Sequence, residues 1–369
     1  MFLFGGRRSV ENETRGVVLD ISDSVINIGI VLSKEGQPLP EIVWSFQELV
    51  TVAEKQKSIE PRLLVSLLNA FMELENNGFA ALRKRGITKL PTLIQVAITA
   101  PLAYTVARTV SVTAEKSFRV TEKLFNELET KAGSEAKKLC TSQLLTKDLD
   151  LEMLSNSTVS LSVNGYPTHY PFKSMATEVK LSQMITLSSK TIVLELNRLR
   201  DKVLPKAEID IDSFMSIYFR AVLEMSPDIT EACFINATTN GTELMVVRDS
   251  LPTSSIYAKN TTPVSAVVKT DALLQDLTTL FKNSGDGLSL PKKMYLHSAV
   301  LAESSLIPLL EQASRSATGV AHQVHPTSKE FFSPAGVRPS SLACSAFVFH
   351  KKLYEDRYLD ESLNVLKYA

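Results

Sequence analysis

The sequence predicts an α/β protein built from two β-sheets with helices packed against them. Apolar stretches with the spacing of strands and of helices alternate in both halves of the chain. Two polar hairpin turns, at residues 22–24 and 238–240, lie about 215 residues apart between apolar runs. The composition, with 44% hydrophobic and 22% charged residues over 369 positions, is that of a globular protein with two or three domains.

The first half of the chain opens with a predicted hairpin, a strand and a helix. Residues 16–32 form two β-branched runs around the first polar turn, and residues 40–51 predict a third strand. Residues 59–86 have helical spacing, and two ends are open for this helix: residues 76–78 (Asn-Asn-Gly) or Gly86. Its predicted apolar face consists of Leu63, Leu64, Leu67, Leu68, Phe71 and Met72.

A compact unit of strands around one helix is expected between residues 92 and 186. Residues 93–112 predict two strands, residues 120–139 an amphipathic helix capped by Thr121, and Asn164-Gly165 a tight turn. The remaining predicted elements are helices at 189–205, 212–225 and 271–283, a buried strand at 292–300, another helix, and an apolar segment at 341–353.

Charge and cysteine content exclude several classes of protein. Lys+Arg and Asp+Glu both number 40, so no net field attracts nucleic acid. Cys140, Cys233 and Cys344 are far apart and form no CxxC pair, which argues against a zinc site or a disulfide framework and favours buried thiols. No stretch approaches the ~20 apolar residues of a membrane span.

The start of the chain, "MFLFGGRRS", has two interpretations. It is either a frayed terminus or a peripheral membrane contact. In the second case Phe2, Leu3 and Phe4 would enter the lipid surface, and Arg7 and Arg8 would meet anionic head groups. The acidic centre of residues 350–369 instead favours a helix packed on this protein or on a partner.

Three stretches resemble the FtsA/PilM family of bacterial actin-like proteins. "GVVLDISDSVINIGIV" is similar to the family's first phosphate motif, with Ser22 in place of a glycine. "LSVNGYPTHYPFKSM" resembles the SHS2-type subdomain called 1C, with Ser174 in place of a glycine. "FINATTNGTELMVVRDS" lies over the second phosphate motif. The matching residues are Asp20, Ile21 and Ser24 in the first stretch and Asn164, Gly165, Tyr166, Pro167, Pro171 and Met175 in the second.

The resemblance implies a two-lobed actin-like (ribonuclease H-like) fold with an inserted 1C subdomain. Lobe 1 (1A) would comprise residues 12–91 and 187–205, and 1C would comprise residues 92–186. Lobe 2 (2A) would comprise residues 206–369. Only 43 residues, 251 to 293, lie between the second phosphate motif and the next strand, so the 2B subdomain is expected to be truncated or missing.

The glycines that a phosphate site of this kind requires are replaced. A phosphate loop needs backbone N–H groups that approach the ligand closely and a carboxylate near Mg²⁺. Asn236 stands where the resemblance places an aspartate, and residues 238–240 (Thr-Thr-Asn) stand where it places three glycines. Residues 297–300 (His-Ser-Ala-Val) likewise replace a glycine-rich turn on the adenosine side. A vestigial or weak nucleotide site would consist of Asp20, Ser22, Asp23, Ser24, Asn236, Thr238, Thr239, Gly241 and Glu243.

Asp20 and Asp23 have a second interpretation, in which they shape their own hairpin turn by hydrogen bonds to local backbone. Because the nucleotide motifs are eroded, the sequence favours no bound cofactor, with ATP and Mg²⁺ as the alternative.

The favoured function is a non-hydrolysing actin-like scaffold in cell division or type IV pilus-like assembly, at the cytoplasmic face of the membrane. The resemblance implies head-to-tail homo-oligomers and a partner that is either a tubulin-like division protein or a peptide of an inner-membrane pilus protein. The candidate interaction residues in 1C are Asn164, Gly165, Tyr166, Pro167 and Phe172. Two alternatives remain: an ATP-binding switch with atypical phosphate loops, and a small-molecule kinase of the same superfold, for which no catalytic aspartate is evident.

Overall fold

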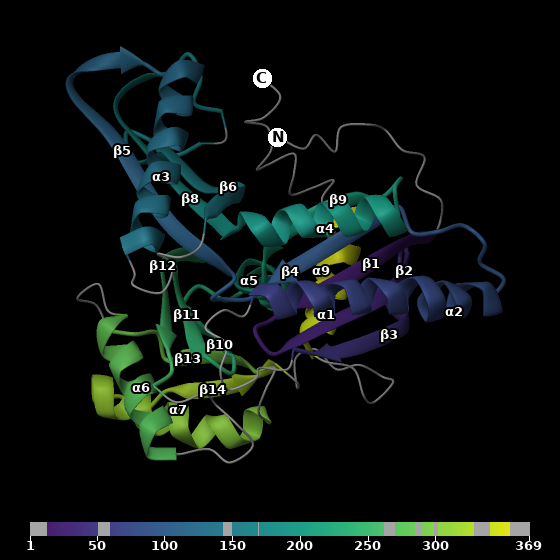
Figure 1. Cartoon of the computed structure of the whole chain (residues 1–369). Helices are drawn as coiled ribbons and strands as arrows, with labels where there is room; N and C mark the ends of the chain where they lie inside the picture. Colours follow the sequence, from purple (N-terminus) through teal and green to yellow (C-terminus); the bar gives the residue numbers. More distant parts are fainter. Residues whose placement is uncertain are drawn as a thin grey trace.

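The chain forms two five-stranded sheets that share one topology, and a third sheet of four strands (Figure 1). The computed structural model describes residues 13–50, 60–142, 150–168, 170–261, 270–284, 289–298, 302–327 and 340–354.

The first sheet has the strand order β3-β2-β1-β4-β9. Its strands are β1 (Glu13–Ile21), β2 (Val25–Lys34), β3 (Glu41–Leu49), β4 (Leu93–Ile98) and β9 (Glu208–Ser213). The first three strands form an antiparallel meander, and β1, β4 and β9 run parallel. The predicted hairpin and third strand are therefore confirmed.

The second sheet repeats this arrangement in the order β12-β11-β10-β13-β14. Its strands are β10 (Ala232–Ala237), β11 (Gly241–Arg248), β12 (Leu251–Lys259), β13 (Lys293–Ser298) and β14 (Gln323–Pro326). Again three strands form an antiparallel meander, and β10, β13 and β14 run parallel. The two polar hairpins thus occupy equivalent places in a duplicated fold.

Helices cover both faces of each sheet, because alternate residues of the central strands are apolar on either side. In β1, Val17 and Leu19 pack against α1 and α4, whereas Val18 packs against α9. In β10, Cys233 packs against α6 and α7, whereas Phe234 packs against α5. The helices are α1 (Glu60–Glu73), α2 (Phe79–Lys84), α4 (Lys190–Val203), α5 (Phe214–Met225), α6 (Thr270–Asn283), α7 (Glu303–Thr318) and α9 (Ser340–Tyr354).

The helices α5 and α9 contact each other and fill the space between the two sheets. The core that they share includes Phe214 and Tyr218 of α5 and Cys344 and Phe347 of α9, together with Phe234 of the second sheet. All three cysteines are buried thiols, as the sequence predicts.

The third sheet projects from the body of the molecule (Figure 1). It has the order β5-β8-β6-β7, and α3 packs on one face of it. Thr121 caps α3, since its hydroxyl accepts a hydrogen bond from the Leu124 N–H at 3.2 Å. Asn164 and Gly165, with φ of 52° and 82°, make the predicted tight turn. The elements are β5 (Ala103–Arg119), α3 (Glu122–Ser142), β6 (Leu151–Val163), β7 (Tyr166–Pro167) and β8 (Met175–Ser189).

The predicted helix over residues 59–86 takes the longer of its two forms. A π-helical turn over Leu74–Gly78 carries the helix past Asn-Asn-Gly into α2, and Gly86 ends it with φ of 76°. The prediction for Met72 is wrong, because this side chain is 49% exposed on the outer side of α1. Phe71, its neighbour, is fully buried.

The division into lobe 1, 1C and lobe 2 stays a prediction. Three elements that are expected outside lobe 1 nevertheless contact the first sheet. β4 and β9, expected in 1C and in lobe 2, both pair within the first sheet. The late apolar segment forms α9, which packs on β1 and β2. The short stretch from 251 to 293 contributes β12 and α6 among its described residues, which fits a reduced 2B.

The predicted membrane contact at Phe2, Leu3, Phe4, Arg7 and Arg8 lies outside the described residues, as do residues 355–369. In the described part of the chain, no helix is long and apolar enough to cross a membrane.

Candidate functional site

The two polar hairpins contact each other directly. The Asp23 side chain, at the tip of the first hairpin, is fully buried. Its Oδ2 accepts hydrogen bonds from the Asn240 backbone N–H at 3.1 Å and from Asn240 Nδ2 at 2.8 Å. The Thr238 hydroxyl lies 3.4 Å from the same oxygen, and its proton is shared with the Gly241 carbonyl at 3.1 Å. We call this set of contacts between Asp23, Thr238 and Asn240 the hairpin clasp.

The first hairpin is shaped by Ser22 rather than by its aspartates. The Ser22 hydroxyl donates to the Val25 carbonyl at 2.9 Å and accepts from the Val25 N–H at 3.0 Å. Ser24 is half-buried, and its carbonyl accepts from the Val50 N–H at 2.8 Å, which joins the turn to the end of β3. Turn shaping is therefore the role of Ser22, whereas Asp23 accepts chiefly from the second hairpin.

Asp20 points away from its turn, toward α9. Its Oδ1 accepts a short hydrogen bond from the Ser345 hydroxyl, and its side chain is 4% exposed. Burial raises the pKa of Asp20 to about 7, although the hydroxyls of Ser345 and Ser341 counteract this effect. The interpretation of Asp20 as a turn-shaping residue is therefore wrong. Its partners, Ser341 and Ser345, lie on α9. We call α5 and α9, which pack between the two five-stranded sheets, the interlobe helices.

Three polar residues of the second sheet lie side by side on its inner face. Glu243, Asn236 and His297 are in register on β11, β10 and β13, and each is at most 2% exposed. Neither polar atom of the Asn236 side chain has a hydrogen-bond partner among the described residues. Burial lowers the pKa of His297 to about 3, so this imidazole is neutral at physiological pH. Ala299 and Val300, expected in the adenosine turn, lie outside the described residues.

Glu243 does not face the first hairpin. It accepts a hydrogen bond from the backbone N–H of Thr105 on β5. Glu243 therefore contacts the third sheet (β5-β8-β6-β7), which we call the 1C sheet because nearly all of its residues are among those expected to form 1C. Thr239, the middle residue of the second turn, is half-buried, and its carbonyl accepts from Asn260 at 3.4 Å.

Gly241 packs against an aromatic ring. A Cβ atom at this position would lie 2.2 Å from the Tyr257 hydroxyl oxygen and 2.5 Å from a ring carbon. The glycine therefore makes room for Tyr257 of β12. This steric role is independent of any phosphate.

Substitution of Gly241 by alanine is expected to lower the free energy of unfolding by about 1–3 kcal/mol, because Tyr257 must move. Urea denaturation measures this change. In a Tyr257→Ala background the cost of Gly241→Ala should largely vanish, as the obstructing ring is gone. Gly133→Ala is the matched control: its Cβ would meet only Met153 at 3.4 Å, and alanine favours helix α3, so it should be neutral or stabilising. Equal costs for Gly241→Ala in both backgrounds would contradict the assignment.

The space around the second hairpin is small. A hollow beside it is lined by Ala237, Thr238 and Thr242 of the hairpin and by apolar residues of α6 and α7. Its enclosed volume of ≈ 10 Å³ is about the room of one water molecule. In the described part of the chain, no three His, Cys, Asp or Glu residues are grouped so that they could hold a metal ion.

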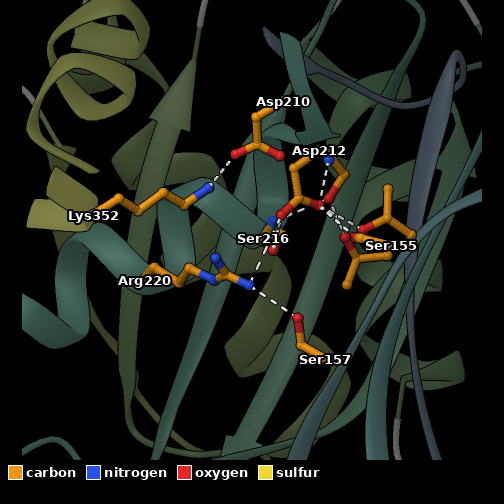
Figure 2. A network of polar contacts seen from close by, with 10 residues as sticks. Ser155, Ser157, Asp210, Asp212, Ser216, Arg220 and Lys352 are labelled. Carbon is orange, nitrogen blue, oxygen red and sulfur yellow. Dashed lines mark hydrogen bonds and ion pairs between the residues drawn. The ribbon is translucent and has the colours of Figure 1, made fainter. Parts of the chain in front are cut away.

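A second polar network joins the 1C sheet to the interlobe helices (Figure 2). Asp212, 4% exposed at the end of β9, accepts from the Thr186 hydroxyl at 2.6 Å, the Ser213 N–H at 2.8 Å and the Ser216 hydroxyl at 3.0 Å. Arg220 of α5 donates to the Ser157 hydroxyl on β6 at 3.1 Å. No local sequence pattern indicates this network. The alternation in "IDIDS" marks Asp210 and Asp212 as one face of a strand, but only the fold shows that the second is buried.

The candidate interaction residues of 1C lie at one end of the projecting sheet. Asn164 holds the turn, as its Oδ1 accepts from the Thr177 N–H at 2.7 Å and the Glu178 N–H at 3.1 Å. Tyr166 is 77% exposed, and Pro167, beside it in β7, is exposed as well. Phe172 is half-buried, with its ring edge-on to Phe125 of α3 at 6.0 Å. Asn164 and Gly165 thus shape the turn, whereas Tyr166 and Pro167 are available to a partner.

Comparisons with known proteins give matches in structure alone. No family model matches the sequence, and no curated protein matches it. A chain of the PilM-PilN type IV pilus biogenesis complex is similar at a TM-score of 0.54 and 11% identity, covering 91% of this chain and 98% of that one. A Bacteroides thetaiotaomicron protein with an actin-like ATPase fold gives a TM-score of 0.47 at 9% identity, covering 90% and 96% of the two chains.

The ethanolamine utilization protein EutJ from Carboxydothermus hydrogenoformans gives a TM-score of 0.40 at 10% identity, covering 89% of each chain. At these identities the likeness concerns the fold. The chain has an α/β fold similar to that of the PilM-PilN complex chain, with two five-stranded sheets of one topology, and the resemblance of its motifs implies such a fold.

Proposed function

We propose that this protein is an actin-like scaffold that neither binds nor hydrolyses ATP and that works through protein–protein contacts. The observation that carries the proposal is the hairpin clasp. In the actin-like fold the two hairpins grip phosphate from opposite sides, whereas here Asp23 of one hairpin accepts hydrogen bonds from Asn240 and Thr238 of the other. Protein groups thus fill the place of the phosphates.

The chemistry of the hairpins supports the same conclusion. Asn236 carries no charge for Mg²⁺, and Glu243 is turned toward β5 instead. Asp23 is fully buried and accepts hydrogen bonds from the second hairpin, and an ionised carboxylate at this position would repel a triphosphate. Gly241, the one glycine left in the second motif, is covered by Tyr257.

The setting of this scaffold is part of the proposal. Its fold is similar to that of a protein in a type IV pilus biogenesis complex, which favours pilus-like assembly over cell division. Head-to-tail association through 1C, with Tyr166 and Pro167 at the contact, would leave the lobes free for an inner-membrane partner peptide. The protein would then act at the cytoplasmic face of the membrane, held there by that partner or by its own N-terminal residues.

Calorimetric titration with Mg-ATP tests the proposal. The full-length protein should give no saturable heat up to ~1 mM nucleotide, the limit at which binding is worth about 4 kcal/mol. It should also release no phosphate above the buffer rate. Micromolar binding with turnover would instead establish the ATP-dependent switch. An Asp23→Ala, Asn240→Gly variant separates the causes. If the clasp alone blocks the site, this variant gains nucleotide binding. If the loss of the nucleotide motifs is enough to prevent binding, the variant gives no binding heat either.

A further inference from the structure

The second sheet contacts the 1C sheet directly, and Glu243 takes part in the contact. β12 of the second sheet lies against β5, and the rings of Tyr257 and Tyr104 meet edge to face at 5.9 Å. Glu243 crosses this junction to accept from the N–H of Thr105, which lies in an edge strand of the 1C sheet. Glu243 as a whole is 2% exposed.

The surroundings of Glu243 favour its neutral form. Its Oε2 has no hydrogen-bond partner among the described residues, and no described lysine or arginine forms an ion pair with it. An ionised carboxylate buried in this way would lack compensation, so the group retains a proton instead. A protonated Oε2 can act as a donor, which an ionised one cannot.

The titratable groups that interact with Glu243 are Tyr104 of β5, Cys140 of α3 and Tyr257 of β12. Two charged groups lie beyond them: Arg108 of β5 acts on Cys140, and Asp23 of the first hairpin acts on Tyr257. Burial raises the pKa of both tyrosines and raises that of Cys140 to about 11, so these three are neutral at physiological pH. Arg108 donates to the Ala107 carbonyl at 2.9 Å. Asp23 is the other acid of the contact, held in the clasp.

We propose that closure of the second sheet onto the 1C sheet is coupled to proton binding at Glu243, and that separating the two sheets releases this proton to solvent. The junction is then a proton-linked hinge contact, independent of whether nucleotide binds. A partner that requires the open form would be favoured at higher pH, and a partner that requires the closed form would take up a proton on binding.

The direction of the pH dependence follows from burial. Burial raises the pKa of Glu243 from 4.5 to about 8 in the closed form. Between these values the closed form holds a proton that the open form has lost. Below the lower value Glu243 therefore favours the closed form fully. Above it, the equilibrium constant for closure decreases by up to about tenfold per pH unit. The contribution of Glu243 to closure is lost once the pH passes the higher value.

Hydrogen exchange of the full-length protein from pH 5.5 to 9, corrected for the chemical exchange rate at each pH, tests the proposal. Protection of the segment 103–107, which contains the Thr105 N–H, should fall with pH relative to segment 16–21 in the centre of the first sheet. The Gln side chain of Glu243→Gln is neutral at every pH. In this variant the protection of segment 103–107 should therefore fall less steeply with pH, and the difference from the wild type is up to about tenfold in protection per pH unit. The pH dependence that remains in the variant belongs to Asp23, whose pKa burial also raises.

Glu115→Gln, the same change at an exposed position of β5, should behave as the wild type does. The proposal is overturned if the wild type shows no loss of protection at 103–107 relative to 16–21. It is equally overturned if Glu243→Gln retains the full pH dependence. The first of these outcomes needs no variant, so the proposal stays testable if Glu243→Gln does not fold.

Discussion

Substitution of Phe234 by alanine is expected to lower the free energy of unfolding by about 3–5 kcal/mol. Phe234 is fully buried at the centre of the second sheet. Its ring lies 5.6 Å from Tyr218, 5.5 Å from Phe219 and 5.4 Å from Tyr295, measured between ring centroids. These rings belong to α5 and β13, so the cavity left by alanine would open between the sheet and the interlobe helix. Close-packed aromatic side chains collapse poorly into such a cavity, which places the cost at the upper end for core residues.

Urea denaturation followed by circular dichroism measures this effect, with Phe118→Ala as the control. Phe118 is only partly buried, on β5 of the 1C sheet, and its removal should cost about 1 kcal/mol. Similar costs for the two variants would mean that the α5 contact is not the main core of the second lobe. A change confined to the denaturant slope would indicate instead that the second lobe unfolds separately.

The strands and helices were predictable because each has a local pattern. Leu63, Leu67 and Phe71 recur at helical spacing and are buried, and the Asn164-Gly165 turn has the residues that positive φ requires. Met72 shows the limit of such patterns. An apolar residue next to a buried one extends the predicted face, but the sheet covers only part of the helix, and Met72 lies beyond it.

The residue list of the candidate site stays a prediction, and the contacts within it cannot be predicted from local patterns. Asp23 belongs to that list, whereas Asn240 is expected only as the replacement of a glycine. The two are 217 positions apart, and no local pattern shows that one accepts from the other. The direction of Asp20 depends on α9, which follows more than 300 positions later as an apolar segment. Gly241 was interpreted as the remnant of a phosphate loop, and its neighbour Tyr257 becomes apparent only when β11 and β12 pair.

Asp212 lies at the point where β9, α5 and the 1C sheet meet, and Asp212→Ala is expected to lower the free energy of unfolding by about 3 kcal/mol at pH 7. The carboxylate accepts from Thr186 of β8, from Ser216 of α5 and from the Ser213 N–H. Removing it leaves these buried donors without an acceptor, and buried donors without partners are costly. The segments around Thr186 and Ser216 should lose hydrogen-exchange protection together, since one side chain holds both.

Asp210, two residues earlier on the same strand, is the matched control because it carries the same charge in a different environment. Its carboxylate is 40% exposed and accepts from Lys352 of α9 at 2.6 Å. An ion pair that remains partly open to solvent contributes about 1 kcal/mol, so Asp210→Ala should cost far less than Asp212→Ala. Lys352 lowers the pKa of Asp210, so this pair stabilises the fold above the usual carboxyl pKa and is lost as the pH falls through the lowered value. The small cost of Asp210→Ala should therefore vanish in acid. If Asp210→Ala cost as much as Asp212→Ala at pH 7, α9 rather than the 1C junction would be the contact that holds β9 in place.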